Sequence, residues 1–272
     1  MNTANIGMRM KATGNDRLKM LQSPLLEEDS HILHFTTTRY GGVSEGNYAS
    51  LNLSEYCGDE PAAVRQNRAA LCASLGIPPA SLYVPHQVHG DRSVLCGQAI
   101  PPTGDADALI TCEAGICVAV STADCVPVLL YEPDQKIVAT VHAGWRGTVR
   151  QIAAKTVRRM AEELGCNPRR MLAAIAPAIG QEAFEVGEEV YEAFAAAAMD
   201  GQPVCMRNRA TGKMHIDLKK ANCLQLTGEG IPAARIDVSG ICTYSRHADF
   251  FSARRLGTDS GRMLTGILMK NN

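Results

Sequence analysis

Residues 116–147 read ICVAVSTADCVPVLLYEPDQKIVATVHAGWRG. Three apolar runs of strand length lie within them, at 116–121, 126–131 and 137–142, and they are rich in Val, Ile and Leu. Branched side chains of this kind favour the pleated, buried surface of a sheet. The loop between the second and third runs is too short for a helical crossover, so these two runs predict an antiparallel hairpin.

Helices are predicted on both sides of this block. Apolar residues keep helical period over 148–164, and Gly165 is placed to end that helix. A similar pattern covers 61–75, with Asp59 as its cap and Gly76 at its end. The remaining predicted elements are helices over 182–198 and 217–227, the latter capped by Asp217, and strands over 32–38, 81–84, 93–96, 171–176, 235–242 and 262–269.

The order of these elements indicates the fold class. Several strands follow one another through hairpins rather than helical crossovers, which predicts an α+β fold with mixed β-sheets and flanking helices. The sequence contains neither G-x-G-x-x-G nor G-x-x-x-x-G-K-[ST], so a dinucleotide-binding or P-loop fold is disfavoured.

Composition excludes several classes of partner. The 272 residues carry a formal net charge of -1, so no basic field favours nucleic acid or a membrane surface. No apolar run is long enough to cross a bilayer, and the first thirty residues lack the apolar segment of a secretory signal. We therefore expect a soluble, cytoplasmic protein. Residues 1–22 are expected to be a disordered or foreign lead-in to a single domain over 23–272.

Ten cysteines call for an explanation. They include no C-x-x-C pair, which disfavours a closed zinc ribbon, and a disulfide scaffold is typical of short secreted chains. Most of them are therefore expected to be small buried apolar side chains. Only a cysteine with polar partners at ligand spacing suggests chemistry.

Cys125 is such a cysteine. A tight turn centred on Pro133 and Asp134 pairs Cys125 with His142 across the hairpin, and a slip of one residue puts Val126 there instead. The two side chains then form a core contact, a Cys/His catalytic dyad or two metal ligands. His86 or His89 offers a third ligand, and two His with one Cys and an open position is typical of catalytic zinc.

The segment after His142 suggests an anion site. His142 to Gly147 lead into the predicted helix over 148–164, where free backbone N–H groups and Arg146 favour phosphate or a carboxylate. An ordinary glycine turn with a solvated arginine is the alternative.

Nine motifs, in order from residue 35 onward, closely resemble the YfiH/YlmD family of laccase-domain, multicopper polyphenol oxidase-like proteins, to which the FAMIN-related purine nucleoside phosphorylases belong. They are Phe35–Ser44 (FTTTRYGGVS), Tyr48–Leu53 (YASLNL), Gln87–Gly90 (QVHG), Asp105–Ala108 (DADA), Thr122–Val128 (TADCVPV), Val141–Gly147 (VHAGWRG), Cys242–Tyr244 (CTY), Phe250–Arg255 (FFSARR) and Gly261–Met263 (GRM).

The resemblance implies a YfiH-like fold, similar to that of cytotoxic necrotizing factor, and an enzyme acting on purine nucleosides. Such enzymes convert adenosine, inosine, guanosine or S-methyl-5'-thioadenosine and phosphate to the base and ribose 1-phosphate, and they also deaminate adenosine. The resemblance further implies that His89, Cys125 and His142 bind Zn²⁺, at a site that could also take Cu²⁺. His86 is the weaker candidate, because it precedes the QVHG motif.

Roles for the other polar residues follow as hypotheses. Arg39 and Arg146 are the candidates for binding phosphate, ahead of Arg254 and Arg255, because the guanidinium fork matches phosphate oxygens. Asp124 or Asp107 is a candidate for proton transfer beside Cys125 and His142, with turn capping as the alternative for each. Ser44 and Asn52 are candidates for the ribose hydroxyls.

Three other functions remain open. A multicopper oxidase needs many histidines in close pairs, whereas this chain has seven and no His-x-His, so copper-dependent polyphenol oxidation is expected to be secondary. A metal-free hydrolase would use Cys125 as nucleophile and His142 as base. A non-catalytic metal or metabolite sensor is the third alternative.

Overall fold

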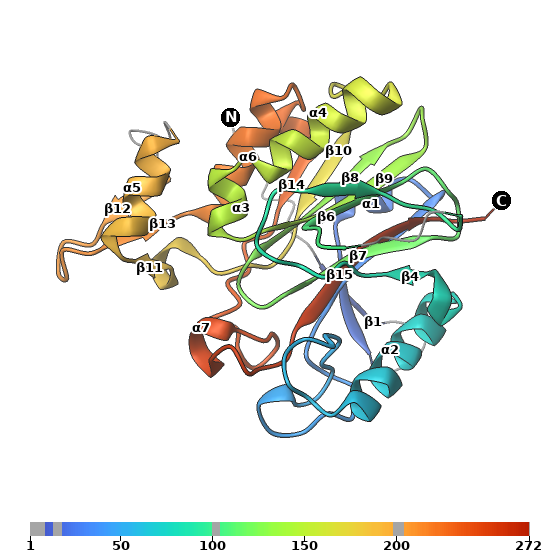
Figure 1. Ribbon diagram of the computed structural model, residues 1–272, viewed down its shortest axis with the longest axis horizontal. Coiled ribbons are helices and arrows are strands. Elements are labelled where there is room, and N and C mark those ends of the chain that lie inside the picture. Colours follow the sequence, from blue (N-terminus) through green and yellow to red (C-terminus); the bar gives the residue numbers. More distant parts are fainter. Residues whose placement is uncertain (1–8, 13–17, 100–103, 198–203, 272) are drawn as a thin grey trace.

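Two mixed β-sheets pack face to face, and helices cover their outer sides (Figure 1). The computed structural model describes residues 9–12, 18–99, 104–197 and 204–271. The first sheet has the strand order β1 (Arg9–Ala12), β2 (Lys19–Gln22), β3 (Ile32–Thr37), β15 (Met263–Met269), β7 (Cys117–Thr122) and β4 (Leu82–Tyr83). The second has the order β14 (Ile236–Val238), β10 (Leu172–Ile175), β8 (Val126–Glu132), β9 (Ile137–Ala143), β6 (Ala108–Thr111) and β5 (Ser93–Leu95).

Most neighbouring strands are antiparallel, but β4 with β7, β5 with β6 and β10 with β14 are parallel pairs. The predicted α+β class with mixed sheets is therefore confirmed. The three central apolar runs form β7, β8 and β9 within one residue of their predicted limits.

Alternation of side chains along the strands separates the layers of the core. Leu129 of β8 and Val118 of β7 share a buried cluster between the sheets. Val141 and Ala143 of β9 belong instead to the cluster beneath the helices α4 (Ile152–Leu164) and α6 (Leu218–Gly228). His142, which lies between them in the strand, therefore faces the space between the two sheets.

The outer face of the first sheet is covered by α2 (Pro61–Leu75), whose Leu71 packs with Cys117 and Ala119 of β7. The other helical segments are α1 (Pro24–Glu27), α3 (Trp145–Val149), α5 (Glu188–Ala196), α7 (Ala253–Leu256), η1 (Gly46–Tyr48), η2 (Pro79–Ser81), η3 (Gln181–Ala183) and η4 (Ala233–Arg235).

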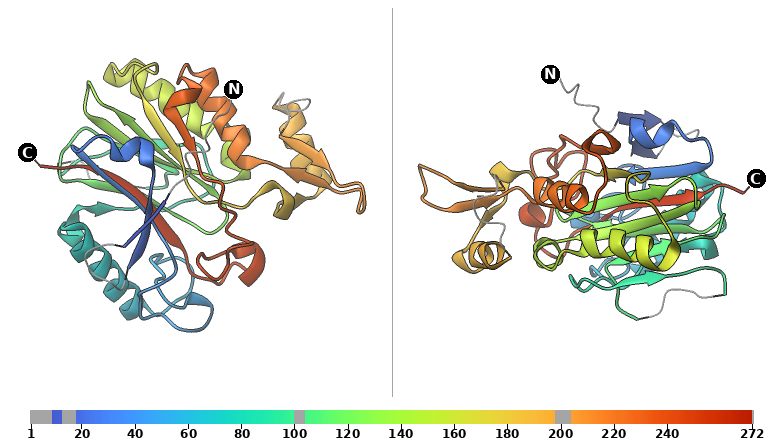
Figure 2. Two further views of the ribbon diagram at one scale, coloured as in Figure 1. Left: turned by 180° about the vertical axis from the view of Figure 1, so that it is seen from behind. Right: turned by 90° about the horizontal axis from the view of Figure 1, so that it is seen from above.

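A small lobe stands away from the two sheets in the views of Figures 1 and 2. It contains α5 and a three-stranded sheet in the order β11 (Glu185–Val186), β13 (Met214–Ile216) and β12 (Cys205–Arg207). The sequence predicted one helix over 182–198 here, but the chain first forms η3 and β11, so the helix begins only at Glu188. Residue 198 lies outside the described residues.

The predicted helix limits are confirmed where glycine ends the helix. Gly76 and Gly165 adopt left-handed backbone angles, with φ of 69° and 70°, and both end their helices as expected. Asp217 caps α6 by accepting a hydrogen bond from the backbone N–H of Lys220. Asp59 does not cap α2, because Glu60 occupies that position and makes no side-chain cap.

The helix predicted over 148–164 is divided into two. α3 begins three residues earlier, at Trp145, and the chain turns at Gln151, whose φ is 63°, before α4 starts. Helical period alone did not reveal this break, since the apolar spacing continues across it. The sequence also missed β6, a short strand directly after Asp107.

The predicted lead-in extends too far, because its last residues, 18–22, are part of the folded domain. β2 pairs with β3, and Leu18 and Leu21 are buried, so residues 18–22 belong to the first sheet and its core. Residues 1–8 and 13–17 of the predicted lead-in lie outside the described residues. No helix in the described part of the chain has the length and apolarity that a membrane span requires.

Candidate metal centre

The register of the β8–β9 hairpin differs from both predicted registers. Glu132 pairs with Ile137, so the loop holds the four residues 133–136 and not two. Pro-Asp is poor chemistry for a two-residue hairpin turn, and Lys136 instead takes a φ of 54° to close the longer loop. Consequently His142 pairs with Pro127, and Cys125 lies beyond the end of β8, across from Gly144.

Gly144 creates the space in which the ligands meet. A Cβ atom at this position would lie 2.9 Å from Cδ2 of His89 and 3.1 Å from Sγ of Cys125. Its φ of -68° is open to any residue, so the requirement for glycine is steric and not conformational. The glycine of the VHAGWRG motif thus lets an imidazole and a thiol approach one another.

Three side chains from separate segments converge there. The ligand atoms of His89, Cys125 and His142 all lie within 4.8 Å of one another, and Sγ of Cys125 is 3.8 Å from Nε2 of His89. Tetrahedral zinc with ordinary Zn–S and Zn–N bonds places sulfur and nitrogen about 3.6 Å apart, so the donor set fits such an ion. His142 is buried, Cys125 half-buried and His89 exposed, which leaves one side open.

A buried carboxylate, that of Asp107, holds this cluster together. The Nδ1 atom of His142 lies 2.7 Å from Oδ1 of Asp107, which leaves Nε2 of His142 free to bind a metal. The backbone N–H groups of Val88, His89 and Gly90 donate to the same carboxylate. His89 needs this support, because its φ of 58° lies in the left-handed region.

The electrostatics favour a thiolate beside an imidazolium when no metal is bound. Burial raises the pKa of the Cys125 thiol, but the charge on His142 and hydrogen bonds from both imidazoles lower it to about 6. Burial lowers the pKa of His142, whereas the Cys125 thiolate and Asp107 raise it to about 9. A thiolate is the form that binds a metal, and binding would release the His142 proton.

The cluster opens into a cavity of about 270 Å³. No Asp or Glu is among its lining residues, and Arg262 is the only Lys or Arg among them. The lining residues are Ser54, Tyr56, Cys57, Pro85, Gln87, His89, Ser121, Thr122, Ala123, Cys125, His142, Ala253, Thr258 and Arg262. Several hydroxyl groups therefore line the cavity beside the three atoms that could hold a metal.

Asp124, predicted as a catalytic residue, does not line the cavity. Its carboxylate accepts hydrogen bonds from the hydroxyls of Thr243 and Ser252 and from the backbone N–H of Arg254. With a φ of 90°, Asp124 also makes the turn between β7 and β8. These contacts match the turn-holding alternative and not proton transfer.

Ser44 and Asn52 do not reach the cavity either. The hydroxyl of Ser44 donates to Asp59 at 2.6 Å, and the side-chain amide of Asn52 donates to the same carboxylate at 2.9 Å. Both side chains are buried, so the structure uses them to fix their loop. The hypothesis that they bind ribose hydroxyls is not supported.

The arginines predicted to bind phosphate also lie elsewhere. Arg39 donates to the carbonyls of Ala49 and His247, which joins two loops. Arg146 is exposed and lies over the ring of Trp145, on a five-residue helix too short to form a strong anion site. Arg254 and Arg255 pack over Phe184 and Tyr244. None of these four arginines lines the cavity.

Sequence reasoning missed four residues that shape the site. Gln87 pins the His89 loop to β7 through the backbone of Ser121, and Tyr56, Thr122 and Arg262 line the cavity. Gln87, Thr122 and Arg262 all lie within motifs shared with the family, and this could have marked them as candidate site residues. Tyr56 carried no signal. His86 is exposed and pairs with Asp105, so of the two candidate histidines only His89 lies in the group that could hold a metal.

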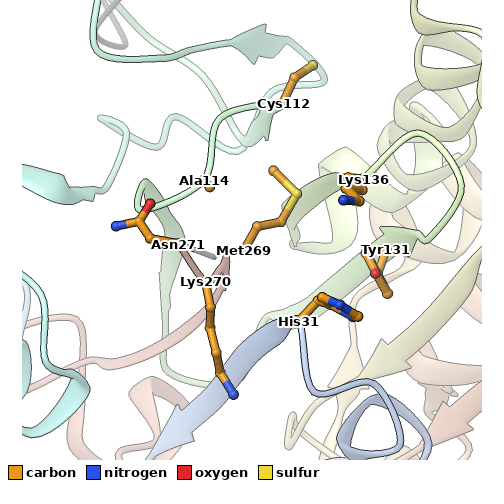
Figure 3. Close-up of a pocket in the computed structure, with 8 residues that line it drawn as sticks. All are labelled: His31, Cys112, Ala114, Tyr131, Lys136, Met269, Lys270 and Asn271. Carbon is orange, nitrogen blue, oxygen red and sulfur yellow. The ribbon is translucent and has the colours of Figure 1, made fainter.

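A second cavity, of about 190 Å³, lies at the opposite ends of the central strands (Figure 3). Its lining includes none of His89, Cys125 and His142, so it is separate from the candidate metal centre. Its lining residues are His31, Cys112, Ala114, Tyr131, Lys136, Met269, Lys270 and Asn271.

Comparison with known proteins identifies the family. The family model described as "Multi-copper polyphenol oxidoreductase laccase" matches residues 33–270, nearly the whole chain. The chain belongs to this family. The crystal structure of its member YlmD from Geobacillus stearothermophilus superimposes with a TM-score of 0.89 at 32% identity, covering 98% of this chain and 100% of YlmD. The YfiH/YlmD resemblance is thereby confirmed.

Relatives of this laccase family have been named for their activities. A purine nucleoside phosphorylase of Bacteroides thetaiotaomicron is 45% identical over 260 residues, which are 92% of this chain and 96% of the relative. The adenosine deaminase RL5, from an unknown prokaryotic organism, is 42% identical over 245 residues, 87% of this chain and 93% of the relative. The prediction that this chain is an enzyme is thus confirmed.

Replacing Asp107 by Asn tests the support of the metal centre. The substitution removes the charge and an acceptor, so His142 and the His89 loop lose their common anchor. We expect zinc affinity to fall about 10- to 100-fold, as for other partners that orient metal-binding histidines. Competition with a chelating dye measures the effect. Asp105→Asn, at an exposed carboxylate that pairs with His86, is the matched control and should leave affinity unchanged.

The lowered pKa of Cys125 predicts unusual thiol reactivity in the metal-free protein. Because the thiolate is the nucleophile, alkylation by iodoacetamide should rise with pH through a midpoint near 6, against about 9 for an ordinary thiol. Peptide mass spectrometry locates the label. His142→Ala should move the midpoint back toward 9, and Zn²⁺ should protect Cys125. Cys112 is more exposed but its pKa is raised, so faster labelling there would contradict this assignment.

Proposed function

We propose that this protein is a zinc-dependent purine nucleoside phosphorylase that also deaminates adenosine. The observation that carries the proposal is the convergence of His89, Cys125 and His142 at the wall of a cavity. Relatives named purine nucleoside phosphorylase and adenosine deaminase support it. The substrates are adenosine, inosine, guanosine or S-methyl-5'-thioadenosine with phosphate, and the products are the base and ribose 1-phosphate.

The ion is proposed to be Zn²⁺, held by one thiolate and two imidazoles. Zinc bound in this way supplies Lewis acidity while keeping a coordination position open. The same donors would accept copper, but they are the one such group of three among the described residues, and multicopper oxidation needs several ions. Phenol oxidation by a copper-loaded form is therefore secondary in this proposal.

The chain's own residues contribute binding and orientation. Asp107 fixes the tautomer and direction of His142, so the metal-binding face is formed before substrate arrives. Hydroxyls of Ser54, Ser121 and Thr258 line the cavity and offer partners for a ribose. Holding nucleoside and phosphate together in one small cavity lowers the entropic part of the barrier.

Tyr56 is the proposed base-binding residue. It lines the cavity, yet 64% of its surface is exposed, and its ring meets the edge of His86 with centroids 4.7 Å apart. An exposed aromatic ring beside a cavity suits a purine, because every base has a face that stacks.

The cytoplasm is the proposed location. All ten cysteines are unpaired, including the exposed Cys112, and a thiolate ligand such as Cys125 persists best where thiols stay reduced.

Metal analysis together with product analysis tests this function. We expect about one zinc per chain, conversion of adenosine to adenine only when phosphate is present, and conversion of adenosine to inosine without phosphate. Removing zinc with a chelator should abolish both reactions, and adding Zn²⁺ should restore them. Full activity in chelator would support the metal-free Cys125 hydrolase instead, and a zinc-loaded protein that turns over no nucleoside would favour a sensor.

Tyr56→Ala tests the binding of the base. Loss of a stacking partner worth about 1–3 kcal/mol should raise KM for adenosine about 5- to 150-fold in both reactions. Tyr56→Phe keeps the ring and is the matched control, with KM close to that of the unmodified protein. Steady-state kinetics at saturating phosphate separates KM from kcat. An unchanged KM in Tyr56→Ala would place the base elsewhere.

A further inference from the structure

Arg262 is a half-buried cation without an ionic partner among the described residues. Its guanidinium donates to the carbonyls of Ser260, Gly261 and Thr258 and to the hydroxyl of Ser260. These acceptors are all neutral, so they fix the direction of the side chain without cancelling its charge. A fixed positive charge facing a cavity with no lining carboxylate favours an anionic ligand.

The backbone of Arg262 is held equally firmly. Its N–H donates to Oδ1 of Asn52, and its carbonyl accepts from the N–H of Leu53. Met263 pairs with Thr122 in the first sheet, which places Arg262 across from Ala123, two residues before Cys125. Arg262 therefore lies at the same end of the first sheet as the candidate metal centre.

Thr122 supplies a second, independent observation. Its side chain is only 2% exposed, it lines the same cavity, and its hydroxyl has no hydrogen-bond partner. A buried hydroxyl left unpaired is destabilising, so such a group indicates that a ligand completes it. A threonine hydroxyl can donate to an anionic oxygen.

We propose that Arg262 and Thr122 form the subsite that binds inorganic phosphate for phosphorolysis. This inference rests on the proposed function and assigns the phosphate to residues other than Arg39 and Arg146. Arg262 offers its charge and its remaining N–H groups to phosphate oxygens, and Thr122 donates its hydroxyl. Phosphate bound here would lie beside the metal centre in the same cavity, as attack on the anomeric carbon of a bound nucleoside requires.

The two activities of the proposed enzyme separate this role from a structural one. Phosphorolysis consumes phosphate, whereas deamination of adenosine does not. Thr122→Val and Arg262→Lys should therefore raise KM for phosphate, about 3- to 10-fold and 10-fold or more respectively, from the loss of a neutral and a charge-assisted hydrogen bond. The rate of deamination in phosphate-free buffer should stay within about twofold of the unmodified protein.

The experiment uses the zinc-loaded full-length chain, with adenine and inosine separated by chromatography. Calorimetric titration with inorganic phosphate measures binding independently of turnover and should weaken in both variants. Arg150→Gln, at an exposed arginine that directly follows α3 and does not line the cavity, is the control and should change neither KM nor phosphate binding. Thr122→Val loses no internal hydrogen bond, so it should fold even if Arg262→Lys disturbs the loop over 258–261.

The outcomes distinguish failure of the phosphate subsite from failure of the proposed function. Unchanged KM and phosphate binding in both variants, or equal losses of phosphorolysis and deamination, would overturn the phosphate subsite. If the unmodified protein catalyses neither reaction, the proposed function fails, while the calorimetric comparison still tests whether Arg262 and Thr122 bind phosphate.

Discussion

The candidate metal centre depends on the buried carboxylate of Asp107. A charge removed from water is costly unless it is fully hydrogen-bonded, and this one is satisfied by the ring of His142 and by three consecutive backbone N–H groups, from Val88 to Gly90. Burial raises the pKa of Asp107, but these contacts outweigh burial and lower it. Because one carboxylate serves both partners, the strand that carries His142 and the loop that carries His89 cannot move independently.

The site lies where the two sheets end together. His142 faces the space between the sheets near the end of β9, Cys125 follows the turn after β7, and Arg262 precedes β15. Antiparallel pairing of β7 with β15 and of β8 with β9 brings these positions to one edge, although they are far apart in the sequence. Apolar side chains such as Val118 and Leu129 pack between the sheets behind these positions.

Many polar residues of the family motifs serve the loops around the site and not the chemistry. Asp124, in the β7–β8 turn, accepts a hydrogen bond from the hydroxyl of Ser252. Asp59 accepts hydrogen bonds from the side chains of Ser44 and Asn52. Such loops lack regular backbone pairing, so buried side-chain hydrogen bonds hold them in one conformation. A preformed cavity of fixed shape is the result, and this explains why polar residues in a motif are poor guides to substrate contacts.

Local patterns in the sequence were enough to predict the α+β class, the central strands within a residue, and the C-terminal ends of α2 and α4, because these follow from alternation, helical period and glycine. Residue type and family motif also predicted His89, Cys125 and His142 as metal ligands, and the structure brings these three side chains together as a group that could hold a metal. The same patterns could not predict the hairpin register, the division of α3 from α4, or which polar residues reach the cavity. Asp107 and Asp124 are both loop aspartates in the sequence. In the structure, Asp107 orients the ring of His142, whereas Asp124 holds the β7–β8 turn in place. Arg39 and Arg262 both stand in motifs, but only Arg262 lines the cavity. The physical reason is that a side chain's partners are set by long-range packing, which neighbours in sequence do not encode.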